Sequence, residues 1–157
     1  MAKVDKLLDR ALFFARHLRG CEPRCLVKLI LIELEVPVNR AGYRYLLLAI
    51  VLLAKEFAQL MTKELYPTVG AYSTPKASGT QVEKDMRTAI GEGWENCDQE
   101  TWSIYFPPNK YGMLERPQSK KFIAKLARFV ELWEDLCRAL DSQETQVCTG
   151  CGEEQVP

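Results

Sequence analysis

Apolar residues recur at helical spacing through residues 78–94 and leave one side of the predicted helix polar. Spacings of three and four residues place one set of side chains on a single face: Val82, Met86, Ala89, Ile90 and Trp94. The opposite side, in the first two turns, carries Gln81, Lys84, Asp85 and Thr88, with Glu83 and Arg87 on its flanks. An ordinary amphipathic surface helix has the same pattern, so this segment alone does not assign a function.

A start signal marks the beginning of this helix. Thr80 and Glu83 form a T-x-x-E capping box, in which each end satisfies a free backbone N–H of the other. Ser78 and Gln81 offer the same offset two residues earlier. The pattern predicts that the helix begins within a residue of Thr80.

The segment just before it predicts a helix-turn-helix. Around Pro67 the chain must kink or begin a new helix, because proline is tolerated at a first helical position. Residues 67–72 then form a short helix, and residues 73–79 form a turn rich in helix breakers. Short helix, turn and capped helix follow in the order of this motif. The predicted turn, about seven residues, is longer than the usual three or four.

The rest of the chain also has helical periodicity. Gly20 and Pro23 close the first helix, and a turn at residues 36–39 precedes the third, which is apolar on more than one face and is expected at the centre of the core. Residues 95–117 are predicted to be irregular, and the polar residues from Asp141 onward to be frayed. The predicted helices cover residues 2–19, 25–34, 40–65 and 118–140.

Composition indicates one globular domain. The chain has 157 residues, of which 47% are hydrophobic and 27% charged, enough to bury a core. Lys plus Arg equals Asp plus Glu at 21 each, so no overall charge draws the protein toward phosphate or a membrane. The chain shows no secretory signal at its start and no apolar run long enough for a membrane span, so we expect a cytoplasmic protein without a membrane partner.

The residues do not form a catalytic pattern. His17 is the single histidine, which excludes a histidine-based triad or a multi-histidine metal site within one chain. No glycine-rich phosphate loop is present. We therefore expect no enzyme, no cofactor and no small-molecule substrate. Cys148 and Cys151 supply half of a tetrahedral zinc site, and Cys21 and Cys25 could supply the other half if the two ends met, so metal binding stays open.

Four sequence blocks carry a resemblance that covers about residues 26–130. Val36-Pro37, Gly42-Tyr43 and Tyr45-Leu46 match VP-x4-GY-x-YL, and residues 62–67 match TK-x-LYP. Val82-Glu83, Arg87, Ala89-Ile90 and Trp94 match a recognition helix, and Arg116-Pro117 with residues 122–124 match a last helix. In this order the blocks resemble the C-terminal DNA-binding effector domain of the stage zero sporulation protein A family, the sporulation master response regulators of endospore-forming Firmicutes.

The resemblance implies an all-α domain of about six helices with a helix-turn-helix that binds double-stranded promoter DNA and regulates transcription. It would occupy residues 21–140, between an N-terminal amphipathic helix at 1–20 and a flexible polar tail at 141–157. In the family the early polar positions of the recognition helix contact bases and phosphates. With a lysine from the turn added, the matching DNA-binding residues are Thr80, Gln81, Glu83, Lys84, Arg87, Thr88 and Lys76.

Departures from the family alter the expected DNA contacts. The family usually has arginine at the positions of Gln81 and Lys84 and alanine at that of Asp85, and lysine lacks the paired contact of arginine with guanine. From Gln81 to Trp94 two cations oppose three carboxylates, so phosphate attraction must come from elsewhere. The candidates are Lys76, Arg116, Lys120, Lys121 and Lys125. The alternative function is a protein-interaction module that keeps the fold and has lost DNA affinity.

The N-terminal region also departs from the family pattern. Full-length relatives carry a receiver domain, and neither the pattern nor the length of this chain fits one, so receiver phosphorylation is not the expected switch. The helix at residues 2–19 stands there instead, with Phe13 and Phe14 widening its apolar surface. It is expected to pack on the core or to pair with another subunit, and a homodimer would double the contacts on repeated half-sites.

Overall fold

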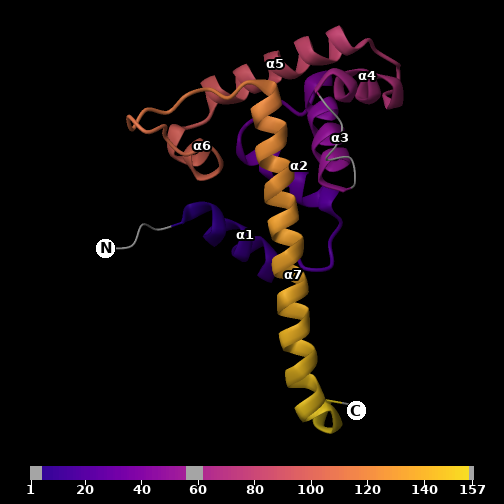
Figure 1. Ribbon diagram of the computed structural model, residues 1–157, viewed down its shortest axis with the longest axis vertical. Coiled ribbons are helices and arrows are strands. Elements are labelled where there is room, and N and C mark those ends of the chain that lie inside the picture. Colours follow the sequence, from indigo (N-terminus) through magenta and orange to yellow (C-terminus); the bar gives the residue numbers. More distant parts are fainter. Residues whose placement is uncertain (1–4, 56–61, 156–157) are drawn as a thin grey trace.

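The computed structural model describes residues 5–55 and 62–155, and the side chains of residues 5–55 and 64–143. Within these ranges the chain folds into seven α-helices and contains no strand, which confirms the predicted all-α class (Figure 1). The first four are α1 (Lys6–His17), α2 (Pro23–Glu33), α3 (Ala41–Lys55) and α4 (Thr62–Tyr72). The last three are α5 (Gly79–Asn96), α6 (Gln99–Tyr105) and α7 (Ser119–Gln155).

Helix α3 lies at the centre of the core, as its apolar sequence predicts. It packs against α2, α4, α5 and α7, and most of its side chains from Tyr45 to Ile50 are buried. Burying apolar surface on several sides is the main source of stability for such a helix. The predicted third helix extended to Leu65, but residues 56–61 lie outside the described part and residues 62–65 belong to α4.

Helix α4 runs through Pro67, where the sequence predicts a kink or a new helix. Proline in a helix interior removes one backbone hydrogen bond and crowds the preceding turn. Here the Pro67 ring packs against the start of α5, since a Cβ added at Gly79 would lie 3.0 Å from Cγ of Pro67. The first helix of the helix-turn-helix is therefore Thr62–Tyr72 and longer than predicted.

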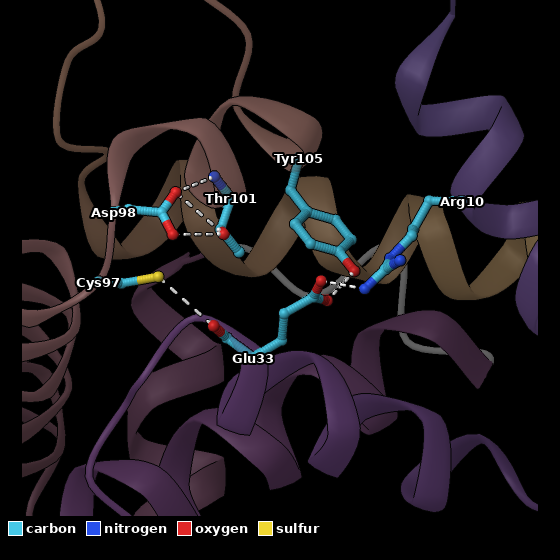
Figure 2. Close-up of polar contacts among 6 residues, drawn as sticks. All are labelled: Arg10, Glu33, Cys97, Asp98, Thr101 and Tyr105. Atoms are coloured by element: carbon cyan, nitrogen blue, oxygen red, sulfur yellow. Dashed lines mark hydrogen bonds and ion pairs between the residues drawn. The ribbon is translucent and has the colours of Figure 1, made fainter.

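Helix α1 packs on the core, the first of the two expected arrangements. It lies against α7 and α6, with Ala11, Phe14 and Ala15 buried. Arg10 forms an ion pair with Glu33 of α2, and the Tyr105 hydroxyl of α6 donates to the same carboxylate at 2.6 Å (Figure 2). One carboxylate thus joins three helices. The predicted division of the chain at residues 20 and 140 stays a prediction.

Helix α6 lies in the region predicted to be irregular. Asp98 is its N-cap, and its carboxylate accepts hydrogen bonds from the Thr101 N–H at 2.8 Å and the Thr101 hydroxyl at 3.1 Å (Figure 2). Trp102, Tyr105 and Phe106 point into the core at helical spacing. The D-x-x-T cap and this spacing are the sequence signals for α6, and the prediction of an irregular segment was wrong here.

Helix α7 is longer than predicted. It begins at Ser119, one residue after the predicted start, and continues past Leu140 to Gln155 (Figure 1). The segment from Asp141, predicted to be frayed, is helical as far as Gln155, and no proline interrupts it. In Figure 1 the last turns of α7 extend beyond the other helices.

Candidate nucleic-acid interface

Helix α5 is held from behind by its apolar face. Val82, Met86, Ala89 and Ile90 are almost completely buried, as their spacing predicts, whereas Trp94 is only partly buried. Helix α3 approaches α5 closely at Gly42, where an added Cβ would lie 2.2 Å from the backbone oxygen of Asp85. The two backbones therefore touch, and only glycine fits at this position.

The turn between α4 and α5 spans residues 73–78, one residue shorter than predicted. The N–H of Ala77 donates to the carbonyl of Gly70 at 3.0 Å, and a Cβ added at Gly70 would lie 2.0 Å from the carbonyl oxygen of Ala77. The Ser73 hydroxyl donates to the Val69 carbonyl at 2.7 Å. The turn thus folds back against the end of α4, which lets a turn longer than usual keep the two helices in contact.

The residue that caps α5 is Ser78, not Thr80. Its hydroxyl accepts a hydrogen bond from the Gln81 N–H at 3.1 Å, and the helix begins at Gly79, which confirms the predicted start within a residue of Thr80. The predicted capping box of Thr80 and Glu83 does not form, because Thr80 lies inside the helix, and Glu83 pairs with Arg87. Of the two candidate pairs found in the sequence, Ser78 with Gln81 and Thr80 with Glu83, the earlier one marks the helix start.

The polar edge of α5 faces solvent. Thr80, Gln81, Lys84, Arg87 and Thr88 are exposed, and Glu83 and Asp85 are partly buried; Lys76 is exposed in the preceding turn. All seven residues predicted to bind DNA are therefore accessible, at least in part, on one element and the turn that leads into it. Their contact with DNA stays a prediction.

Two side-chain pairs run along this edge. The Gln81 amide donates to both carboxylate oxygens of Asp85 at 2.9 and 3.0 Å, and Arg87 Nη1 lies 3.3 Å from Glu83 Oε2. Both pairs join residues one helical turn apart, a common arrangement on exposed helices. Lys84 and Thr88, in contrast, have no hydrogen-bond or ion-pair partner within the described ranges.

Cations from outside α5 border the helix. Arg40 Nη2 lies 3.1 Å from Glu92 Oε1, which compensates one of the carboxylates of the helix. A Cβ added at Gly91 would lie 2.9 Å from Nη1 of Arg116, so this guanidinium rests on the α5 backbone. Sequence reasoning missed Arg40, since no local pattern links it to α5.

A cavity of about 460 Å³ lies between α5 and the start of α7. It is lined by Tyr66 and Ile90, by the Glu83 carboxylate, and by three cationic side chains, Arg87, Arg116 and Lys120. The first turn of a helix carries partial positive charge, so the start of α7 adds to the attraction for an anion here. Of the cations suggested by the sequence, Arg116 and Lys120 reach this cavity, whereas Lys121 and Lys125 are not among its lining residues.

A comparison with known protein families decides the classification. The family described as "Sporulation initiation factor Spo0A C terminal" matches residues 27–130. The chain belongs to this family. Its members are DNA-binding transcription regulator domains and not enzymes. The match includes α3, α4, α5 and α6, most of α2 and the first part of α7, and leaves α1 outside.

Two other features of the chain bear on this Spo0A C-terminal domain. The described residues contain no strand, so the α/β receiver domain of full-length relatives is not found within them. No helix in the described part of the chain is long and apolar enough to cross a membrane.

The residues considered for metal binding do not come together where their side chains are described. No group of three or more possible ligands is found within those side chains, and the His17 ring lies against Phe13, tilted by 48°, with ring centroids 4.5 Å apart. Cys21 and Cys25 are free and exposed. The side chains of Cys148 and Cys151 lie outside the described set, so the zinc question raised by the sequence concerns residues that the structure does not describe.

Proposed function

We propose that this Spo0A C-terminal domain is a sequence-specific transcription regulator that inserts α5 into the major groove of promoter DNA. The observation that carries the proposal is the division of α5 into two sides. Its apolar side is fixed on α3 and α4, and its first two turns expose a row of polar side chains. Recognition helices of helix-turn-helix proteins meet base edges with this part of the helix.

The residues on the exposed edge divide into base and backbone contacts. Lys84 has no partner within the described part of the chain, which leaves its ammonium group available to guanine or phosphate. Gln81 matches the donor and acceptor pattern of adenine but would have to leave Asp85. Thr80 and Thr88 are suited to either role, as is Glu83, whose carboxylate accepts from cytosine.

The backbone of the DNA strand would lie beside the cavity at the start of α7. Arg87, Arg116 and Lys120 line that cavity, and Lys76 adds a cation at the other end of the helix. A phosphate near these side chains would offset the carboxylates carried by α5 itself. This arrangement supplies the phosphate attraction that the balanced composition does not.

The first experiment selects preferred sites from random duplexes and then measures the affinity of the best site by fluorescence anisotropy at two salt concentrations. We expect saturable binding that weakens steeply as salt rises, because binding releases counterions from the DNA. Lys84→Ala and Arg87→Ala should each weaken binding by about 1–3 kcal/mol. Arg128→Ala, an exposed arginine of α7 outside the site, serves as the matched control.

The urea unfolding curves of these variants are needed for the comparison. Both α5 variants should unfold close to wild type, since exposed side chains contribute little to stability. If both bound the selected site as well as Arg128→Ala does, the assignment of the edge to DNA would be wrong. Glu83→Ala should change the preferred bases more than the affinity, and it costs little stability because Glu83 does not cap α5.

A protein-interaction module is the second candidate function. It is favoured by Asp85, which holds Gln81 through two hydrogen bonds and places a carboxylate where the family has alanine. No detectable complex with any duplex at low salt would support it. A homodimer and a cytoplasmic location belong to the first proposal, and analytical ultracentrifugation with and without the selected duplex tests the oligomeric state.

A further inference from the structure

A second cavity, of about 350 Å³, lies beside α3 and the helix-turn-helix turn. Its volume falls at the lower end of the range for small-molecule sites. Residues 73–74 of the turn line it, together with side chains from three helices: Arg24 of α2; Arg44, Leu47, Leu48 and Val51 of α3; and Tyr72 of α4.

This cavity is on the side of α3 that faces away from the recognition helix. Arg44, Leu48 and Val51 follow one another at i, i+4 and i+7 and so form one stripe. At 3.6 residues per turn, this stripe is roughly 180° around α3 from Gly42, which touches α5. The cavity is therefore separate from the surface proposed to meet DNA.

The lining combines an apolar floor with uncompensated positive charge. Leu47, Leu48 and Val51 form the floor, and Tyr72, which is 71% exposed, stands at the edge. Arg24 and Arg44 are the charged lining residues, and no carboxylate among the described side chains lines the cavity. Within the described ranges neither arginine has an ion-pair partner, which leaves two guanidinium groups beside an apolar surface.

We propose that this cavity binds a small apolar anion, a carboxylate carried on an acyl or aryl body. The body would cover the leucine and valine side chains, where each buried methylene group contributes favourable transfer free energy. The carboxylate would lie between Arg24 and Arg44, because guanidinium groups bind carboxylates through paired, charge-assisted hydrogen bonds. The hydroxyl groups of Ser73 and Thr74 are further donors at the edge.

Both parts of the ligand are needed for this fit. A fully hydrophilic anion would leave the apolar floor exposed to water, and an uncharged apolar molecule would leave the two guanidinium groups without a counterion. The occupant is therefore an amphiphile with a single negative end, not a polyanion such as nucleic acid.

Octanoate is the probe, and 1-octanol is its uncharged match. A titration of the ¹⁵N-labelled full chain followed by heteronuclear NMR should show saturable shifts confined to the residues around the cavity, at and next to Arg24, at 44–51 and at 72–74. 1-Octanol should bind at least about tenfold more weakly, since it lacks the charge that the two arginines bind. Equal binding of the two probes, or shifts spread over the whole chain, would overturn the proposal.

The variants test the charges directly. Arg24→Leu combined with Arg44→Leu should weaken octanoate binding by about tenfold or more and leave 1-octanol binding unchanged. Arg16→Leu, which removes an exposed arginine from α1, should bind octanoate as wild type does. If the double variant bound octanoate as tightly as Arg16→Leu, the two arginines would not form the site.

A filled cavity gives an independent readout. Val51→Phe adds volume to the floor and keeps both arginines, so it should reduce the binding of both probes. Urea unfolding identifies any variant that is misfolded, and Val51→Ala, which removes volume at the same position instead of adding it, is the paired variant. No DNA is present in any of these experiments, so their outcome does not depend on whether α5 binds promoter DNA.

Discussion

An arginine–glutamate ion pair occurs both at Glu33, between packed helices, and on the exposed edge of α5, and the two pairs have different roles. Each contains an arginine paired with a glutamate, Arg10 with Glu33 and Arg87 with Glu83. The side chain of Glu33 is 19% exposed and also accepts from the buried Tyr105 hydroxyl, whereas the side chain of Arg87 is 57% exposed. The Arg10–Glu33 pair, which joins packed helices, therefore stabilises the fold. The Arg87–Glu83 pair is exposed, and its arginine is available to a binding partner.

The difference follows from the surroundings of the charges. In solvent the attraction between two charges is weak and screened by salt, and exposed pairs contribute between 0 and about 1 kcal/mol. Away from water the attraction is stronger, and a polar group that loses its partner has no water to replace it. Changes at Glu33 should therefore alter stability, and changes on α5 should alter binding.

Glu33→Ala should have the largest effect on stability. It removes the acceptor of the Tyr105 hydroxyl and the partner of Arg10, and hydrogen bonds to charged groups contribute about 1.5–3 kcal/mol each. We expect a loss of about 2–3 kcal/mol in the free energy of unfolding, measured with urea. Glu131→Ala, at an exposed position of α7, is the control. If Glu33→Ala lost no more stability than this control, the Glu33 ion pair would contribute no more than an exposed pair does.

Tyr105→Phe should cost less, about 1.5 kcal/mol, because the ring stays and Glu33 keeps its ion pair with Arg10. Burial, and then the nearby Glu33 carboxylate, raise the pKa of Tyr105 above the ordinary value of 10.0. The folded protein therefore keeps this proton longer than the unfolded chain, so stability is fully present below about pH 10 and falls as pH rises further.

The pH experiment compares wild type with Tyr105→Phe by urea unfolding between pH 8 and about pH 11. The variant should lose less stability over the alkaline part of this range. Burial also raises the pKa of Tyr43 and of Tyr66, but both residues are present in both proteins, so the difference reports Tyr105. Parallel curves would contradict the raised pKa.

Ser78→Ala should cost about 1 kcal/mol of stability, because it removes the cap of α5. Thr80→Ala is the matched control and should change stability by less than about 0.5 kcal/mol, since Thr80 lies inside the helix and does not cap it. Thermal unfolding followed by circular dichroism measures both. A larger loss of stability in Thr80→Ala than in Ser78→Ala would instead support the capping box predicted from the sequence.

Asp85→Ala should have the smallest effect on stability, less than about 0.5 kcal/mol. It removes a carboxylate from the edge of α5 and releases the Gln81 amide. On the proposed function, DNA affinity should rise by about 0.5–1 kcal/mol, with Glu95→Ala as a control at the far end of the helix. Weaker binding of the selected duplex would mean that Asp85 itself contributes to recognition.

Local sequence signals predicted α5 well because its determinants are local. The spacing of apolar residues at intervals of three and four predicted which side of the helix is buried. The serine and threonine near its start predicted where the first turn begins. The predicted start of α5, within a residue of Thr80, was confirmed, but the cap is Ser78 and not Thr80. Both residues stand three positions before a glutamine or glutamate, so the local pattern does not distinguish them.

The features that the sequence did not predict depend on residues far apart in the chain. Glu33 and Tyr105 are separated by 72 positions, and no periodicity links them. Arg40 and Glu92 are likewise paired only in the fold. The cavity beside α3 requires α2, α3 and the turn to be placed together, so its arginines read in sequence as ordinary surface charges.

The close approach of α3 and α5 at Gly42 makes the position of the recognition helix depend on a residue without a side chain. Any side chain added at position 42 would collide with the carbonyl oxygen of Asp85, so even Gly42→Ala has to push α5 away from α3. Promoter reading is therefore sensitive to a buried position that, on the proposed function, touches no part of the DNA.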